Sequence, residues 1–295
     1  MSPTPTPQSD AKNGRDRKQK LRWLAIILPI TIGLIVSFNL GPVLWQLLTS
    51  LKVNADISKV PNIYIPTRYT LSHYGELFQR SQFLRYMFNS AFVALISTAL
   101  CLGLGSPAAY ALARLRLRGE QIILSAVLIV TLFPYILLFL GLLEVVRILG
   151  WGNNYLALVV PYTAINLPLT ILVMRSFFQQ LPKDLEDSAK VDGYSTLQML
   201  VQILLPMTLP ALVTTGILAF IFSWNEYIFA LTFMTRDELK TIPVAAAQLG
   251  GTSLFDIPYG PLAAATIIGT LPLILLVLFF QRRIVQGLTA GAVKG

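Results

Sequence analysis

Long apolar stretches alternate with short polar segments along this chain, and their lengths predict helices that cross a membrane. Each stretch exceeds the roughly 20 residues that a helix needs to span a bilayer core. The first is also too long for the apolar region of a signal peptide. One crossing is hidden in the longer uncharged stretch 193–225, which Pro206 divides. The predicted spans are residues 23–48, 86–113, 121–143, 148–174, 207–231 and 257–281.

The longest polar interruption in the C-terminal half, residues 181–206, has the pattern of two short helices around a turn. Acidic residues open the first predicted helix and Lys190 lies in its last turn, an order that complements the helix dipole. Glu186 and Lys190 are spaced as a favourable i, i+4 pair. Gly193 is placed to take the left-handed conformation that ends such a helix.

The second predicted helix begins just after this turn. Ser195 and Gln198 fit the S-x-x-Q capping box, in which each side chain satisfies a backbone N–H of the other residue. Apolar residues then recur at i, i+3, i+4 and i+7, which predicts one apolar face. The residues on this face are Leu197, Leu200, Val201 and Leu204.

Composition agrees with a single membrane domain. Of the 295 residues, 55% are hydrophobic and 13% are charged. The formal net charge of +9 would suit a nucleic-acid partner, but the basic residues gather in a terminal tail and in short loops beside apolar spans. Cys101 is the only cysteine, which excludes an internal disulfide and a Cys-based metal site, and His73 is the only histidine, which excludes a His-cluster metal site.

The distribution of Lys and Arg orients the predicted spans. Residues 1–22 are rich in Pro, Ser, Thr and charge, and are predicted to form a disordered basic tail. Placing this tail in the cytoplasm puts most of the 23 Lys and Arg residues on the cytoplasmic side, as the positive-inside rule requires. Segment 181–206 and a C-terminal tail, residues 282–295, then also lie in the cytoplasm.

Segment 181–206 resembles the cytoplasmic EAA loop of ABC-importer permeases, whose pattern is E-A-A-x-x-D-G followed by I-x-L-P. The matching residues are Asp187-Ser188-Ala189-Lys190-Val191-Asp192-Gly193 and Ile203-Leu204-Leu205-Pro206. Asp187 and Ser188 replace the family's Glu and first Ala, and keep charge and size. The resemblance implies that this loop docks in a groove of an ATPase. It assigns that role to Glu186, Asp187, Ser188, Ala189, Asp192, Gly193 and Pro206.

Other segments are similar to the carbohydrate branch of these permeases. They are residues 83–90, 109–114, the W-N-E-Y box at 224–227 and the chain end at 287–295. The chain end resembles that of maltose-type permeases, in which the tail inserts between the two ATPase subunits. The resemblance therefore implies ATPase contacts by Gly287, Leu288, Thr289, Ala290, Gly291 and Lys294.

The resemblance implies an all-α polytopic membrane protein with the type I ABC importer permease fold. The implied function is that of a permease subunit of a bacterial ABC importer for a sugar or sugar-like solute, located in the inner membrane. Its expected partners are a second homologous permease, two ATP-binding subunits, an extracytoplasmic substrate-binding protein and membrane lipid. The sequence has no G-x-x-x-x-G-K-[ST] motif, so ATP and Mg are expected on the partner ATPases, with no cofactor and no enzymatic activity in this chain.

Three polar residues in apolar runs, Tyr135, Asn166 and Asn225, could line a path for sugar, and each could equally make hydrogen bonds between helices. Glu226 would suggest ion coupling if it lay at mid-membrane. Its distance from Met207 favours an interfacial acid beside a Trp/Tyr belt. An ABC permease for another solute class and an ion-coupled secondary transporter are the alternative functions.

Overall fold

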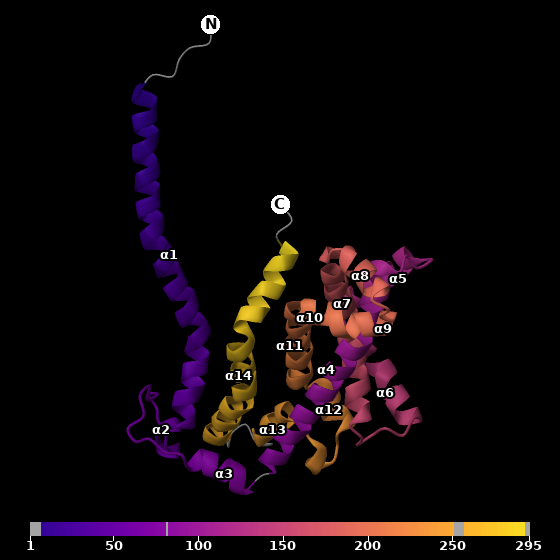
Figure 1. The fold of residues 1–295 in the computed structure, drawn as a ribbon. Coiled ribbons are helices and arrows are strands. Elements are labelled where there is room, and N and C mark those ends of the chain that lie inside the picture. Colours follow the sequence, from indigo (N-terminus) through magenta and orange to yellow (C-terminus); the bar gives the residue numbers. More distant parts are fainter. Residues whose placement is uncertain (1–6, 81, 251–256, 293–295) are drawn as a thin grey trace.

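The computed structural model describes residues 7–80, 82–250 and 257–292, and this part of the chain is built from helices without a strand (Figure 1). The predicted all-α fold is confirmed for these ranges. In chain order the helices are α1 (Pro7–Ser50), α2 (Asn54–Ile57), α3 (Ser72–Arg80), α4 (Phe83–Arg114), α5 (Glu120–Leu132), η1 (Tyr135–Leu138), α6 (Phe139–Ile148), α7 (Leu156–Gln180), α8 (Asp184–Val191), α9 (Thr196–Met199), η2 (Leu200–Leu204), α10 (Leu205–Met207), α11 (Leu209–Asn225), α12 (Ile228–Phe233), η3 (Asp237–Leu239), α13 (Ile242–Leu249) and α14 (Tyr259–Ala292).

Four helices within the described ranges are long and apolar enough to cross a membrane. They contain the segments Ala25–Ser50, Phe83–Arg114, Leu156–Gln180 and Tyr259–Arg283. Two further crossings arise if each of two bent helix pairs counts as one span. The bend between α5 and the η1–α6 segment is 94°, and the bend between α9–α10 and α11 is 85°. The six predicted spans therefore agree with the structure only if each of the two bent helix pairs is counted as one crossing.

Two of the predicted spans differ from the helices because of local backbone chemistry. The predicted span 121–143 is broken after Leu132, where Phe133 is extended with φ −74° and ψ 130° before Pro134. A residue that precedes proline is disfavoured in the helical region. The predicted span 148–174 begins late, at Leu156, because Gly150 and Asn153 have positive φ angles of 64° and 60° in the turn before it.

Helices extend into both predicted tails. The prediction of a disordered tail at residues 1–22 conflicts with α1, which is helical from Pro7, where Lys, Arg and Gln favour a helix. Residues 282–292 of the predicted C-terminal tail are helical, because α14 continues past the apolar segment through Ala292. Residues 1–6 and 293–295, including Lys294, lie outside the described residues.

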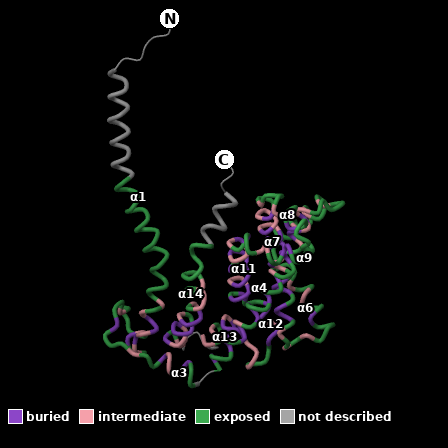
Figure 2. The backbone as a smooth tube through the Cα atoms, in the orientation of Figure 1, coloured by how far each residue is buried: buried purple, intermediate pink, exposed green. Residues whose placement is uncertain are grey.

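Helices α4, α7 and α11 form the packed centre of the molecule. Buried residues concentrate in these helices, while α1 is exposed over most of its described length (Figure 2). Small polar side chains bridge the central helices: Ser97 Oγ lies 3.0 Å from Ser223 Oγ, and Cys101 Sγ lies 3.1 Å from Thr170 Oγ1. Such contacts are typical of helix packing in membranes. Helix α1 instead packs against α14, which in turn packs against α11.

The start of α14 is fitted closely to α3. The His73 side chain is 2% exposed and its Nε2 lies 2.8 Å from the Lys52 carbonyl oxygen. A Cβ atom at Gly260 would lie 2.3 Å from His73 Nε2. The absence of a side chain at position 260 therefore allows α14 to begin against α3.

Replacing Gly260 by alanine is expected to lower the thermal midpoint of the purified protein, because a buried His73 has no room to move aside. Overpacking of this kind costs about 1–3 kcal/mol. The matched control is Gly103→Ala in α4, where an added Cβ would meet nothing within 4 Å. That substitution should leave the midpoint unchanged or raise it, since alanine favours a helix over glycine. Equal midpoints for the two variants would contradict the close fit.

Candidate functional site

The polar segment between α7 and α11 folds as two short helices around a tight turn, as predicted. Gly193 has φ +81°, and the N–H of Tyr194 donates to the Ala189 carbonyl at 3.0 Å. The N–H of Gly193 donates to the Lys190 carbonyl at 3.1 Å, which completes a Schellman motif. Ser195 opens α9 with the predicted capping box. The left-handed glycine and the capping box are therefore both confirmed.

Glu186 does not pair with Lys190, so that part of the prediction is wrong. Its carboxylate points into the protein, where Oε1 forms an ion pair with Arg114 Nε at 2.9 Å, and the two side chains are 10% and 7% exposed. The Tyr110 hydroxyl donates to Glu186 Oε2 at 3.3 Å. Lys190 pairs with Asp187 instead, at 3.6 Å. A buried ion pair thus fastens α8 to the end of α4.

Arg114 also holds the chain just before α8, through a hydrogen bond to the backbone. Arg114 Nη2 donates to the carbonyl oxygen of Leu181. The aromatic ring of Tyr110 packs edge-to-face on Phe178 of α7, with ring centroids 5.8 Å apart. The end of α4 is therefore joined to α7, to the chain that leaves it and to α8.

The surface of segment 181–206 is divided between residues that face the bundle and residues that face outward. Ala189 is buried, at 2% exposed, like Glu186. The other residues that the sequence assigned to ATPase docking are exposed: Asp187, Ser188, Asp192, Gly193 and Pro206. Val191, between them, is 87% exposed.

The apolar face predicted for the second helix is rearranged in the structure. Leu200 and Leu204 are buried as expected, whereas Leu197 is 66% exposed and Val201 is 52% exposed. The cause is η2, which is a π-helix and so turns more slowly per residue than the α-helix assumed in the prediction. Met199 takes an inward position that the predicted face did not include. Apolar side chains are thereby left on the outer surface of the segment.

A cavity of about 350 Å³ lies beside the break between α5 and η1. Tyr135, the first residue after Pro134, and Asn166, in the middle of α7, both line it. Phe222 of α11 completes this group, with its ring centroid 5.3 Å from that of Tyr135. Asn225 is not among the lining residues, and its Nδ2 donates to the Ile221 carbonyl of its own helix. Two of the three predicted path residues are thus brought together.

The model of a protein family described as "binding-protein-dependent transport system inner membrane component" matches residues 101–290. The chain belongs to this family. The sulfoquinovosyl glycerol transport system permease protein SmoH of Agrobacterium fabrum is 38% identical over 266 residues, which cover 90% of this chain and 93% of SmoH. The trehalose/maltose transport system permease protein MalG of Thermococcus litoralis is 38% identical over 276 residues, which cover 93% of this chain and 97% of MalG.

The fold of this inner membrane component also matches a solved structure. A chain of a bacterial ABC transporter involved in the import of the acidic polysaccharide alginate superposes with a TM-score of 0.75 at 21% identity, covering 95% of this chain and 99% of that one. This likeness concerns the fold alone. It agrees with the predicted fold of an ABC importer permease. The sequence identity to MalG confirms the resemblance to maltose-type permeases.

Glu226 of the transport component directly follows the last residue of α11 and is buried among protein groups. It is 5% exposed and accepts a hydrogen bond from the Tyr162 hydroxyl. Its Oε1 accepts from the backbone N–H of Phe229 at 3.0 Å. Glu226 therefore caps α12 and joins it to α7. Sequence reasoning missed Tyr162, because it lies 64 residues away and has no local signal.

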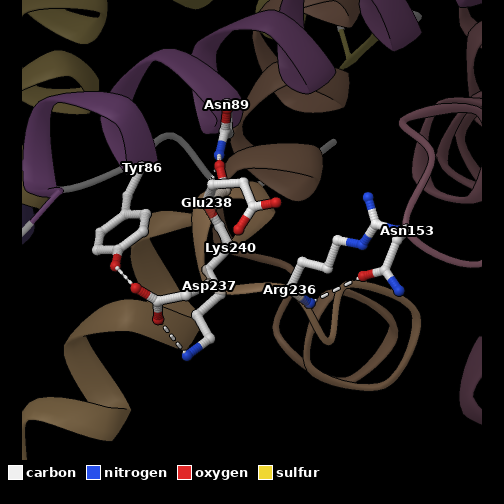
Figure 3. A network of polar contacts seen from close by, with 7 residues as sticks. All are labelled: Tyr86, Asn89, Asn153, Arg236, Asp237, Glu238 and Lys240. Carbon is white, nitrogen blue, oxygen red and sulfur yellow. Dashed lines mark hydrogen bonds and ion pairs between the residues drawn. The ribbon is translucent and has the colours of Figure 1, made fainter.

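At the end of the bundle opposite α8, a polar network joins loops that are distant in sequence (Figure 3). The Tyr86 hydroxyl donates to Asp237 Oδ2 at 2.9 Å, and Lys240 Nζ donates to Asp237 Oδ1 at 2.6 Å. Asn89 Nδ2 donates to the backbone carbonyls of Glu238 and Lys240. The hydrogen bonds from Lys240 and Tyr86 hold the pKa of Asp237 below its ordinary value. This network fixes the loop around η3 against the start of α4.

Proposed function

We propose that this transport component is a permease subunit of an ABC importer for a sugar or sugar-like solute. It would pair with a second, homologous permease, two ATP-binding subunits and an extracytoplasmic substrate-binding protein. Both termini and segment 181–206 would lie in the cytoplasm, where the ATPases reach them. ATP and Mg would bind to the ATP-binding subunits, and this chain would transmit motion rather than catalyse a reaction.

The observation that carries this proposal is the two-sided construction of segment 181–206. Its inner side is fixed to α4 by the Arg114–Glu186 ion pair, and its outer side exposes Val191, Leu197 and Val201. These exposed apolar side chains are available for contact with a partner protein. A partner that pushes on the outer side would move α4 and α11, because the ion pair and the short α9–α10 connection transmit the displacement.

The solute class is supported by the relatives and by the cavity beside Tyr135. The two relatives are named as permeases for sulfoquinovosyl glycerol and for trehalose/maltose, and all of these solutes contain sugars. The cavity offers aromatic rings together with the Asn166 carboxamide, a combination that suits the apolar faces and hydroxyls of a sugar. Its volume of about 350 Å³ falls in the usual range for small-molecule pockets. We therefore place Tyr135, Asn166 and Phe222 along the path of the solute.

Reconstitution into vesicles tests this function. The complete importer, with its binding protein, should take up a labelled disaccharide only when ATP is supplied to the ATPase side. This chain alone should neither hydrolyse ATP nor accumulate sugar. Gradient-driven uptake by the chain alone would overturn the proposal in favour of a secondary transporter. ATP-driven uptake of another solute class, with no sugar transported, would overturn the sugar assignment.

Deleting residues 288–295 is expected to lower the ATP hydrolysis that accompanies transport, because the end of the chain is proposed to contact the ATPases. Membrane insertion and pairing with the partner permease should persist, since the buried residues of α14 among those described lie between Gly260 and Gly269, well before the deletion. The measurement compares subunit stoichiometry and stimulated ATPase activity of the truncated and full-length complexes. Full stimulation in the truncated complex would show that the tail has no part in coupling.

A further inference from the structure

A second cavity, of about 300 Å³, lies where α1 ends against α2 and the beginning of α14. It is far from α8, at the opposite end of the molecule (Figure 1). The apolar segment of α1, Ala25–Ser50, ends at its wall. Trp45 and Tyr259 contribute aromatic rings, and such residues are typical of the boundary between lipid and water. We therefore expect the cavity at the depth of lipid headgroups.

The cavity holds a buried positive charge that is incompletely partnered. Lys52 is 3% exposed, and its ammonium group lies 4.2 Å from the centroid of the Trp45 ring. The carbonyl of Ile63 is the one hydrogen-bond acceptor that it has among the described residues. An ammonium group has three N–H donors, and burying a charge is costly unless it is paired. The Lys52 ammonium can thus serve an anionic oxygen in the cavity.

A second unpartnered group lies in the same wall. Thr49 is 9% exposed, and its hydroxyl is buried with no hydrogen-bond partner in the described part of the chain. Leaving a buried donor unsatisfied costs free energy that a ligand oxygen would recover. Lys52 and Thr49 both line the cavity, so one anionic group can satisfy both.

The opposite charge is present as well. Asp56 lines the cavity, is 7% exposed and makes no ion pair with Lys52 within the described residues. Both of its carboxylate oxygens accept hydrogen bonds from Thr67, and the side-chain and backbone bonds together lower the pKa of Asp56. A simple anion would meet repulsion from this carboxylate. A ligand with a negative and a positive group would satisfy both Lys52 and Asp56.

We propose that this cavity binds the headgroup of a zwitterionic phospholipid, with the phosphate on Lys52 and Thr49 and the ammonium toward Asp56. The acyl chains would lie along α1, whose apolar side chains are exposed next to the cavity; Phe38 is 83% exposed and Leu34 is 67% exposed. A lipid bound there would fill the space between α1 and α14. The inference depends on the membrane location of the family and not on the identity of the transported solute.

The test uses the complete importer, purified in detergent and stripped of lipid. Phosphatidylethanolamine is added, and bound lipid is counted by native mass spectrometry while the thermal midpoint is followed. Thr49→Val keeps the shape of the side chain and removes a hydroxyl that has no protein partner, so the fold should be unaffected. This variant, and Lys52→Gln, are expected to weaken lipid binding about tenfold, as for loss of a hydrogen bond to a charged group.

Arg68→Gln is the matched control, because Arg68 is an exposed basic residue of the same connection and does not line the cavity, so this variant should bind lipid like the unmodified protein. Unchanged binding in both Thr49→Val and Lys52→Gln would overturn the proposal. Equal binding of phosphatidylglycerol would contradict the zwitterionic headgroup. If soluble phosphoethanolamine at the same concentration gave the full thermal shift, the ligand of the cavity would be a free phosphate ester and not a lipid.

Discussion

Replacing Gly193 by valine is expected to abolish stimulation of the ATPase by the loaded binding protein while leaving the permease inserted in the membrane. Gly193 has φ +81°, a conformation that a β-branched residue adopts only at a cost of about 1–2 kcal/mol. No atom lies within 4 Å of the Cβ position, so the effect comes from the backbone and not from a clash. The turn would relax to another conformation and move Val191 away from its position.

Gly119→Val provides a control for backbone strain. Gly119 has φ +80° and also has open space at its Cβ position, but it lies in the connection between α4 and α5. The two variants should lose similar thermal stability, and only Gly193→Val should lose stimulated ATP hydrolysis in the reconstituted importer. If both variants lost stimulated ATP hydrolysis equally, the loss in Gly193→Val would be due to general destabilisation of the protein. Normal stimulation and uptake in Gly193→Val would contradict a required left-handed turn.

Replacing Glu186 by glutamine is expected to destabilise the protein strongly, because it leaves the Arg114 charge buried without its partner. Breaking a buried ion pair by removing one charge typically costs about 3–5 kcal/mol. The thermal midpoint of the purified complex should fall, and coupling should fall with it because α8 is no longer fixed to α4. Changing both residues together, Arg114→Leu with Glu186→Leu, should restore part of the lost stability, since no lone charge is then buried.

Asp187→Asn is the matched control for the buried pair. Asp187 is the neighbouring acid and also pairs with a basic residue, Lys190, but these side chains are 73% and 61% exposed. An exposed ion pair contributes about 0–1 kcal/mol. A midpoint for Glu186→Gln that matches the midpoint for Asp187→Asn would show that the Arg114 contact does not hold α8 in place.

The local features of segment 181–206 could be predicted from the sequence because they depend on residues a few positions apart. The left-handed Gly193 follows from helix termination, and the Ser195–Gln198 capping box follows from a spacing of three. The partner of Glu186 could not be predicted in this way. Arg114 lies on another helix, and only the tertiary packing decides that Glu186 turns toward it and away from Lys190.

Backbone irregularities account for the other differences. Hydropathy predicts one span over 121–143, because it treats Pro134 as one more uncharged residue, whereas the backbone breaks there. The π-helix of η2 likewise has no signal in an apolar pattern read with an α-helical period, so that pattern predicts Leu197 and Val201 on the buried face. Hydropathy predicts which segments are apolar enough to cross the membrane. The positions at which a helix breaks depend on backbone geometry, which hydropathy does not describe.

The residues predicted to line a path for the solute also show that sequence cannot predict tertiary contacts. Tyr135 and Asn166 are polar groups in apolar runs, and the structure brings them together because the break at Pro134 turns Tyr135 toward α7. Asn225 met the same criterion and lies elsewhere. The sequence identified polar residues within the membrane, but it could not tell which of them share a cavity.

Labelling of a single cysteine tests most directly whether the outer side of segment 181–206 docks on an ATPase. Val191→Cys introduces a thiol at an 87% exposed position, while the native Cys101 is buried. Val60→Cys, at a 90% exposed position near α2, is the control. Adding the ATPase should strongly slow maleimide labelling of Val191→Cys and leave Val60→Cys unchanged. Equal labelling rates of Val191→Cys with and without a bound ATPase would contradict docking at this segment.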